Sequence, residues 1–146
     1  MQNAIRFKDQ NLSITHFYNE VLIECVVCSK MAKCSVSNET NVAKLICLNC
    51  GLNKTKNTQI DAYIRVIMPA HSYFNATLWL QYSFKKSLFW AYNYEHLNYL
   101  EAYIQSTLRE HDERQGFTLL EKLPKFIHKG TNREGLLKII KKLKSK

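Results

Sequence analysis

The segment Glu24–Gly51, ECVVCSKMAKCSVSNETNVAKLICLNCG, decides the fold, because it holds all five cysteines of this 146-residue chain. Four of them form two Cys-x-x-Cys pairs, Cys25 with Cys28 and Cys47 with Cys50, and eighteen residues separate the pairs. Each pair presents two sulfurs on one side of a tight turn, and two such turns can surround zinc tetrahedrally. The spacing therefore predicts one structural Zn²⁺ bound by these four thiolates.

Other uses of the cysteines fit the sequence less well. A disulfide framework conflicts with an odd number of cysteines and with the first twenty residues, which lack an apolar segment long enough for a signal peptide. No run reaches the length of a membrane span, so we expect a soluble, cytoplasmic protein. A thioredoxin-like redox pair would leave the second Cys-x-x-Cys unexplained, and an iron–sulfur cluster is the alternative metal group.

The fifth cysteine, Cys34, is expected to lie away from the metal. The apolar, β-branched residues around both pairs predict two hairpins with the cysteine turns at their tips. If residues 29–34 run extended, Cys34 ends roughly 20 Å from the metal as a small buried hydrophobic residue. A looped segment would instead bring it back as a substitute ligand.

The residue after each Cys-x-x-Cys pair differs between the two turns. Gly51 supplies the positive φ that a Cys-x-x-Cys turn favours, whereas the first turn has Ser29 at this position.

The rest of the chain alternates between strand and helix patterns. Residues 61–68, DAYIRVIM, predict a strand, and residues 77–93 predict two more strands with the turn at Lys85 and Lys86. Residues 94–113 predict a helix capped by Asn93. Its apolar positions recur at helical spacing, at Leu97, Leu100, Ile104 and Leu108.

Two further helices are predicted near the end of the chain. A short one lies in residues 118–129, interrupted or started afresh near Pro124 and ended by Gly130. The last begins at Thr131 or Asn132 and places Leu136, Ile139, Ile140 and Leu143 on one stripe.

Together these patterns predict an α+β protein with a β zinc ribbon, a β-hairpin region and about three C-terminal helices. We divide the chain into an N-terminal arm at residues 1–20, the ribbon at 21–58 and an α+β region at 59–146. No long linker separates the parts, so we expect the ribbon and the α+β region to pack as one unit.

Three runs in the second half resemble a known family. They are LWLQYSFKKSLFWAYNYEHLNYLEAYIQSTLRE, LLEKLPKFI and NREGLLKIIKKLK, and they resemble small bacterial proteins that contain a transcription factor IIB type zinc ribbon. The likeness spans most of the chain from Cys25 onward. It implies a zinc-binding fold with Cys25, Cys28, Cys47 and Cys50 as ligands, and it implies no activity, because none is established for the family.

Basic residues concentrate in two places. The formal net charge is +9, and residues 122–146 hold nine Lys/Arg against the single acid Glu134. The ribbon adds the lysines Lys30, Lys33, Lys44, Lys54 and Lys56. Lysines attract phosphates without reading sequence, so we predict a module that binds nucleic acid. The expected contact residues are Lys138, Lys141, Lys142 and Lys144.

The alternative is a protein–protein adaptor with a purely structural zinc site. Cations in the last turns of a helix also stabilise its dipole and keep the surface soluble. Lysines that form one continuous surface favour nucleic acid, and scattered lysines favour the adaptor. The aromatic residues are expected to be core rather than base-stacking platforms, and they include Trp79, Trp90, Tyr92 and Tyr99.

An enzyme is the least supported class. Catalytic zinc keeps an open position for water, whereas four thiolates fill the coordination sphere. The five histidines are scattered, and His96, beside Glu95, is expected to be an ordinary polar position of a helix. With four glycines in the chain there is no glycine-rich phosphate loop, so we predict no catalytic residues and no small-molecule substrate.

Overall fold

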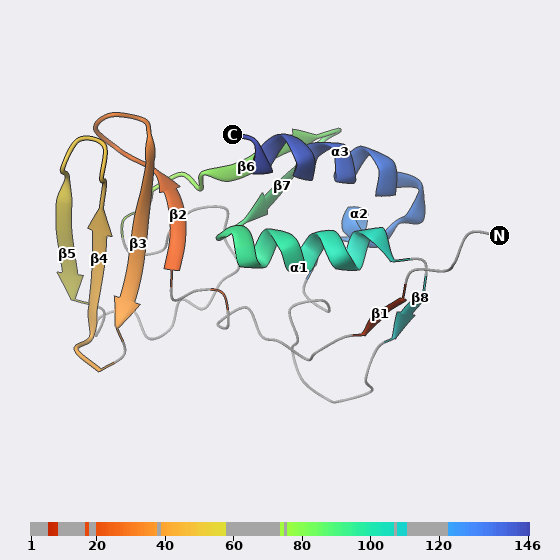
Figure 1. The fold of residues 1–146 in the computed structure, drawn as a ribbon, viewed down its shortest axis with the longest axis horizontal. Coiled ribbons are helices and arrows are strands. Elements are labelled where there is room, and N and C mark those ends of the chain that lie inside the picture. Colours follow the sequence, from red (N-terminus) through yellow and green to blue (C-terminus); the bar gives the residue numbers. More distant parts are fainter. Residues whose placement is uncertain are drawn as a thin grey trace.

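The computed structural model describes residues 6–8, 17, 20–37, 39–57, 74, 76–106, 108–110 and 123–146. These residues form a four-stranded sheet, two two-stranded sheets and a set of C-terminal helices (Figure 1). The predicted α+β class is confirmed, with the four-cysteine group near the N-terminus. None of the described helices is long and apolar enough to cross a membrane.

The ribbon is an antiparallel sheet of four strands in sequence order. The strands are β2 (Glu20–Glu24), β3 (Met31–Ser37), β4 (Val42–Ile46) and β5 (Asn53–Asn57). The cysteine turns join β2 to β3 and β4 to β5, so both lie at the same end of the sheet (Figure 1). The prediction of two hairpins with the cysteines at their tips is confirmed.

Strand β2 pairs with β3 on one side, and its other side joins the ribbon to the rest of the molecule. Ile23 forms an isolated antiparallel bridge with Leu78. Around it, the Leu22 N–H donates to the Tyr92 carbonyl oxygen at 2.7 Å, and the Trp79 N–H donates to the Leu22 carbonyl oxygen at 3.0 Å. Backbone hydrogen bonds therefore continue from the ribbon into the segments on both sides of the next hairpin.

That hairpin consists of β6 (Leu80–Phe84) and β7 (Ser87–Ala91), as the alternating pattern predicted. Lys85 and Lys86 form its turn, and Lys85 has a φ of 52°. Alternation places Leu80 in the core opposite Ala91, with both side chains fully buried. One face of the hairpin thus packs inward, which is how a two-stranded sheet becomes stable.

Helix α1 (Tyr94–Gln105) begins as predicted and ends earlier than predicted. The extended Ser106 stops it, and its hydroxyl donates to the Tyr103 carbonyl oxygen at 2.7 Å. The Arg133 Nε donates to the Ile104 carbonyl oxygen at 3.0 Å, so a side chain from another helix satisfies a terminal carbonyl group.

The predicted continuation of this helix through Leu108 is wrong. Leu108–Glu110 is strand β8, which pairs in parallel with β1 (Arg6–Lys8) from the start of the chain. The apolar spacing extended across the boundary, but the distant strand partner and Arg133 determine where the helix stops.

The C-terminal segment contains α2 (Lys125–His128), directly after Pro124, then the 3₁₀ turn η3 (Gly130–Asn132) and α3 (Arg133–Lys144). The predicted start near Pro124 is confirmed, while Gly130 begins the 3₁₀ turn that leads into α3. The predicted stripe of α3 is buried at all four positions, Leu136, Ile139, Ile140 and Leu143.

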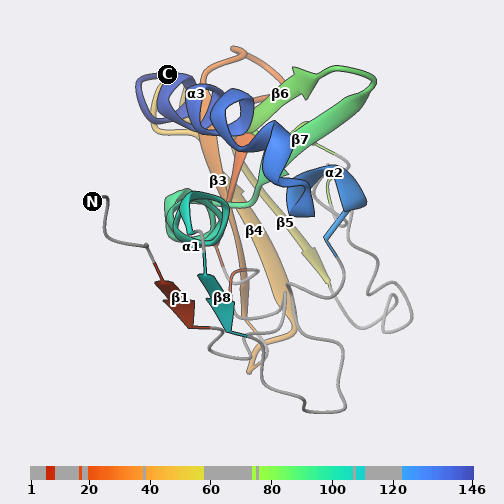
Figure 2. The same cartoon turned by 90° about the vertical axis from the view of Figure 1, so that its right-hand side faces the viewer.

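One glycine of α3 lets the helix lie close to the hairpin. A Cβ at Gly135 would come within 2.8 Å of Cε2 of Phe84 on β6, closer than real Cβ contacts allow. Phe84 in turn stacks on Phe126, with the ring centroids 5.9 Å apart. Figure 2 shows α3 lying over α1 and beside the hairpin, where this close approach occurs.

Buried side chains form two clusters. We call the larger one the helix–hairpin core, and it contains Leu22, Leu80, Phe89, Ala91, Leu97, Leu100, Tyr103, Ile104, Ile127, Leu136, Ile139, Ile140 and Leu143. We call the smaller one the ribbon core, and it contains Val21, Ile23, Cys25, Ala32, Cys34, Leu45, Cys47, Ala76, Leu78 and Tyr92. Tyr92 is thus core as predicted, and Trp79, Trp90 and Tyr99 pack against the two clusters.

Some predictions lie outside the described residues. They are the strand at residues 61–68, the start of the short helix at residues 118–122, and most of the N-terminal arm. Within that arm, β1 and the buried Phe17 are described.

Candidate metal centre

The first cysteine turn, residues 25–30, is held closed by two backbone hydrogen bonds. We call it the first knuckle. The Cys25 N–H donates to the Lys30 carbonyl oxygen at 2.7 Å, and the Ser29 N–H donates to the Cys25 carbonyl oxygen at 3.0 Å. Ser29 has a φ of 62°, in the left-handed region that favours glycine. The sequence placed no glycine here, and the turn forms with a serine in the strained conformation.

The second knuckle, residues 47–52, repeats this arrangement. The Cys47 N–H donates to the Leu52 carbonyl oxygen and the Gly51 N–H donates to the Cys47 carbonyl oxygen, both at 2.9 Å. Gly51 has the predicted positive φ, 80°. The two knuckles are therefore structurally equivalent turns, and each one points a pair of sulfurs toward the other.

The four sulfurs converge on one point. Cys25 Sγ lies 3.6 Å from Cys50 Sγ, and Cys28 Sγ lies 3.5 Å from Cys47 Sγ. All four lie within 4.8 Å of one another. A zinc ion with Zn–S bonds of about 2.3 Å places its sulfurs about 3.8 Å apart at the corners of a tetrahedron. The arrangement fits a single tetrahedral ion.

Hydrogen-bond donors surround two of the sulfurs. The Val27 N–H donates to Cys25 Sγ at 3.4 Å, and the Asn49 side-chain amide donates to Cys28 Sγ at 3.4 Å. The Asn49 amide and a backbone hydrogen bond from Lys30 lower the pKa of Cys28 to about 6. A backbone hydrogen bond from Cys28 lowers the pKa of Cys25 as well. These donors favour the thiolate, which is the form that binds metal.

Cys50 differs from Cys25 and Cys28 in the direction in which its pKa is shifted. A backbone hydrogen bond from Leu52 favours the thiolate of Cys50, but loss of solvent and the neighbouring sulfurs outweigh it and raise the pKa of Cys50 to about 12. Like charges this close disfavour full ionisation of the group. A bound divalent ion removes that penalty, and four soft thiolates are the donor set that zinc prefers.

Cys34 does not belong to the metal group. It lies in the middle of β3, fully buried between Val21 of β2 and Leu45 of β4. Burial raises the pKa of the Cys34 thiol to about 12, so it stays protonated. The sequence expectation of a small buried hydrophobic residue is confirmed.

Two of the four C-terminal lysines predicted to contact nucleic acid bind other parts of this protein. Lys142 Nζ lies 5.2 Å from the ring centroid of Tyr82 and 3.3 Å from its hydroxyl oxygen. Lys144 Nζ lies 2.8 Å from a carboxylate oxygen of Glu101 on α1. These side chains attach α3 to the elements on both sides of it.

The other two, Lys138 and Lys141, are exposed on α3, on the side away from its buried stripe. The last lysine, Lys146, lies over the Trp79 ring at 4.0 Å and donates to the Trp79 carbonyl oxygen at 2.8 Å. The C-terminal lysines therefore do not act as one free cationic row.

The ribbon lysines lie elsewhere. Lys33 pairs with Glu20 at 3.5 Å, and Lys44 and Lys54 are exposed on β4 and β5. Figure 1 shows β5 at one end of the molecule, and α3 is oriented with its C-terminal end, whose last turn carries Lys141, Lys142 and Lys144, nearer to the ribbon than its first turn. The ribbon lysines thus lie on strands of the sheet and the C-terminal lysines on a helix.

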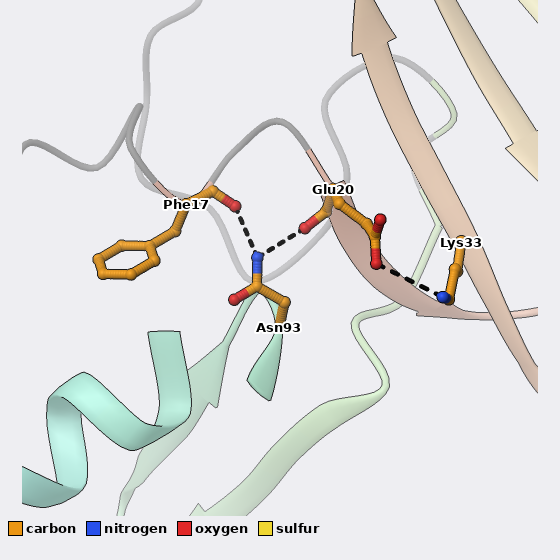
Figure 3. Close-up of polar contacts among 4 residues, drawn as sticks. All are labelled: Phe17, Glu20, Lys33 and Asn93. Carbon is orange, nitrogen blue, oxygen red and sulfur yellow. Dashed lines mark hydrogen bonds and ion pairs between the residues drawn. The ribbon is translucent and has the colours of Figure 1, made fainter. Parts of the chain in front are cut away.

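Sequence reasoning missed the wider role of Asn93, which it named only as a helix cap. The Asn93 Oδ1 accepts from the His96 N–H at 2.8 Å, as a cap does. The Asn93 Nδ2 also donates to the carbonyl oxygens of Phe17 and Glu20, at 2.9 and 2.7 Å. Figure 3 shows this junction, with Glu20 reaching on to Lys33. One side chain joins the N-terminal segment, the ribbon and α1.

The expectation that His96 is an ordinary polar position is wrong, because its side chain is 1% exposed. Its ring stacks on Phe17 at 4.9 Å, and its Nδ1 accepts from the Tyr92 N–H at 3.0 Å. Burial lowers the pKa of His96 to about 3. The signal was available, since residues 96, 100 and 103 share one face of a helix.

No known protein family matches this chain, and no curated protein or solved structure does. The resemblance to proteins with a transcription factor IIB type zinc ribbon therefore stays a prediction.

Proposed function

We propose that this protein is a non-catalytic binding module stabilised by one structural zinc ion. The observation that carries the proposal is the convergence of four sulfurs from two equivalent knuckles, with all four within 4.8 Å of one another. This is the arrangement that the resemblance to zinc ribbon proteins implies. The zinc holds two hairpins together, and the surface around it is available for binding.

The geometry of the donors supports a structural role over a catalytic one. Four thiolates fill a tetrahedral sphere, so no position is left for the water or substrate of a catalytic zinc. Each of the two histidines among the described residues uses its Nδ1 in a contact within the protein. His96 Nδ1 accepts from Tyr92, and His128 Nδ1 lies 2.6 Å from the Tyr103 hydroxyl oxygen.

Metal analysis tests the zinc site directly. The purified chain should contain one zinc ion per molecule when its metal content is measured by inductively coupled plasma mass spectrometry. Replacement by Co²⁺ should give the absorption of a tetrahedral four-thiolate site. A chain that folds fully with no bound metal would contradict the proposal.

We propose a protein as the partner, because the apolar surface is concentrated at the knuckles. Among the described residues, four exposed large hydrophobic side chains lie in or beside the knuckles: Val26, Val27, Met31 and Leu48. Leu48 is 88% exposed. We call Val26, Val27 and Leu48 the apolar tip. Exposed apolar clusters of this kind are typical of protein interaction sites.

Nucleic acid is the second candidate, through Lys138 and Lys141 on α3. Both side chains are exposed and lie one helical turn apart, so they can approach a phosphate backbone together. The neighbouring lysines Lys142, Lys144 and Lys146 contact Tyr82, Glu101 and Trp79 of this chain, which makes the candidate weaker than the adaptor.

A pair of double variants separates the two candidates. For a protein partner, Val27→Ser with Leu48→Ser should abolish capture of a defined protein from the native host, while Lys138→Ala with Lys141→Ala should leave it unchanged. For nucleic acid, the lysine variant should weaken binding to a labelled random DNA, and wild-type affinity should fall steeply with salt. All four positions are exposed, so neither variant should change stability by more than about 0.5 kcal/mol.

A further inference from the structure

The two knuckles have equivalent backbones but different side chains at one position. The residue just before the second cysteine is Val27 in the first knuckle and Asn49 in the second knuckle. The Asn49 amide Nδ2 reaches across the site and donates to Cys28 Sγ of the opposite knuckle at 3.4 Å. Valine has no donor, so the first knuckle makes no such side-chain contact in return.

This contact is unlike the others at the sulfurs. The remaining donors to a sulfur among the described residues are backbone N–H groups or other thiols, and the Val27 N–H serves a cysteine of its own knuckle. Apart from the cysteines themselves, Asn49 is therefore the one side chain, within the described chain, that hydrogen-bonds from one knuckle to a ligand of the other. The closed turn of residues 47–52 fixes the backbone from which the Asn49 side chain extends.

We propose that Asn49 is a positioning residue for the metal site. From the opposite knuckle, its amide orients the Cys28 thiolate and lowers the nucleophilicity of that thiolate. The inference depends on the proposed zinc site. An N–H that donates to an anionic sulfur is a charge-assisted hydrogen bond, which withdraws electron density from the thiolate and makes it less nucleophilic. It also fixes the direction of the sulfur lone pairs that bind zinc.

The size of the effect follows from known supporting contacts at metal sites. Loss of a group that hydrogen-bonds a ligand costs about 10- to 100-fold in metal affinity. Asn49 is exposed, and water can replace part of its hydrogen bond, so the lower end applies. We expect about a tenfold loss for Asn49→Val, which copies the residue of the first knuckle.

The test uses the full chain and four proteins: wild type, Asn49→Val, Asn49→Asp and Asn53→Ala. Asn49→Asp keeps the shape but replaces the donor with a negative charge near the sulfur. Asn53→Ala changes an exposed asparagine at the start of β5 and serves as the matched control. Zinc affinity is measured by competition with a chelator, and the Co²⁺ forms are compared by their thiolate-to-cobalt charge-transfer bands.

A further measurement isolates Cys28. In zinc-saturated protein, the alkylation rate of each cysteine by N-ethylmaleimide is followed by mass spectrometry. In the Asn49→Val variant, N-ethylmaleimide should alkylate Cys28 several times faster than it does in wild type, with the alkylation rate of Cys50 unchanged. It should also shift the charge-transfer band and lose about tenfold in affinity, and Asn49→Asp should lose more.

Several results would overturn the inference while the zinc proposal survives. One is a wild type that binds one zinc and an Asn49→Val variant with the same affinity and the same Co²⁺ spectrum. Another is faster alkylation of all four cysteines together, which would show general loosening of the knuckles. A wild type without stoichiometric zinc would instead contradict the zinc proposal itself.

Discussion

The ribbon and the helix–hairpin region are stabilised in different ways. The helix–hairpin core consists almost wholly of Leu, Ile, Phe and Tyr side chains. The ribbon core includes three cysteines and two alanines, and it takes Ala76, Leu78 and Tyr92 from outside the ribbon sheet. Apolar burial supplies the stability of the first region, while the second has too little apolar mass. We propose that a metal ion bound by the four cysteines makes up the difference.

The largest expected effect is the loss of a zinc ligand. Cys47→Ser should release the metal and unfold the ribbon, because zinc binding contributes about 10 kcal/mol or more to modules of this kind. Amide exchange should lose protection in β2–β5, while α1 and α3 keep their helical circular dichroism. Full metal content and unchanged amide-exchange protection of the ribbon in this variant would contradict the proposal that the ribbon depends on the metal.

Acid should weaken the helix–hairpin region for a separate reason, the buried His96. Its pKa is about 3 in the folded protein, against 6.5 for an ordinary histidine. The unfolded chain therefore takes up the proton first, and stability falls as pH drops from about 6.5 toward 3. The slope is about 1.4 kcal/mol per pH unit, with a total of about 5 kcal/mol.

The control for this pH dependence is His96→Asn, whose Oδ1 can accept from the Tyr92 N–H in place of Nδ1. The free energy of unfolding is measured by denaturant titration at several pH values, with metal content followed in parallel. The difference in the free energy of unfolding between wild type and variant should become smaller as the pH falls. Parallel stability curves would show that His96 does not titrate as the structure implies.

A large-to-small substitution in the helix–hairpin core should cost less than zinc loss but should leave the metal bound. Leu100→Ala removes a fully buried side chain of α1, which costs about 3 kcal/mol. Leu48→Ala, at the exposed tip, is the matched control and should leave stability unchanged. Release of zinc by Leu100→Ala would mean that the two regions unfold as one.

The junction between the regions should have an intermediate effect. Asn93→Ala removes the cap of α1 and both hydrogen bonds to the carbonyl oxygens of Phe17 and Glu20. We expect a loss of about 2–3 kcal/mol in thermal or denaturant unfolding, with zinc retained. A change below about 0.5 kcal/mol would show that the junction contributes little.

The smallest effect is expected at Cys34. Cys34→Ala removes a buried, protonated thiol that lies outside the metal group, so it should cost about 1 kcal/mol and keep one zinc per chain. Cys50→Ser, which also changes one sulfur, should lose the metal. Equal zinc loss in both variants would place Cys34 among the ligands.

The four cysteines of the metal group could be identified from the sequence because their arrangement is local. Two residues between cysteines fix a tight turn, and the β-branched residues around it fix the strands that carry the turn. The hairpin at Lys85 and Lys86 and the buried stripe of α3 follow from the same short-range periodicity. Such features depend on neighbours along the chain, which the sequence states directly.

Only the tertiary structure decided the features that depend on distant partners. Arg133 and the β1–β8 pair end α1 at Gln105, although the apolar spacing continued to Leu108. The contacts of Lys142 and Lys144 with Tyr82 and Glu101 exist because α3 packs between the hairpin and α1. The reach of Asn49 to Cys28 likewise requires two knuckles to face each other. The sequence determined which residues can bind metal or form the core, and the packing of distant segments determined which polar groups meet.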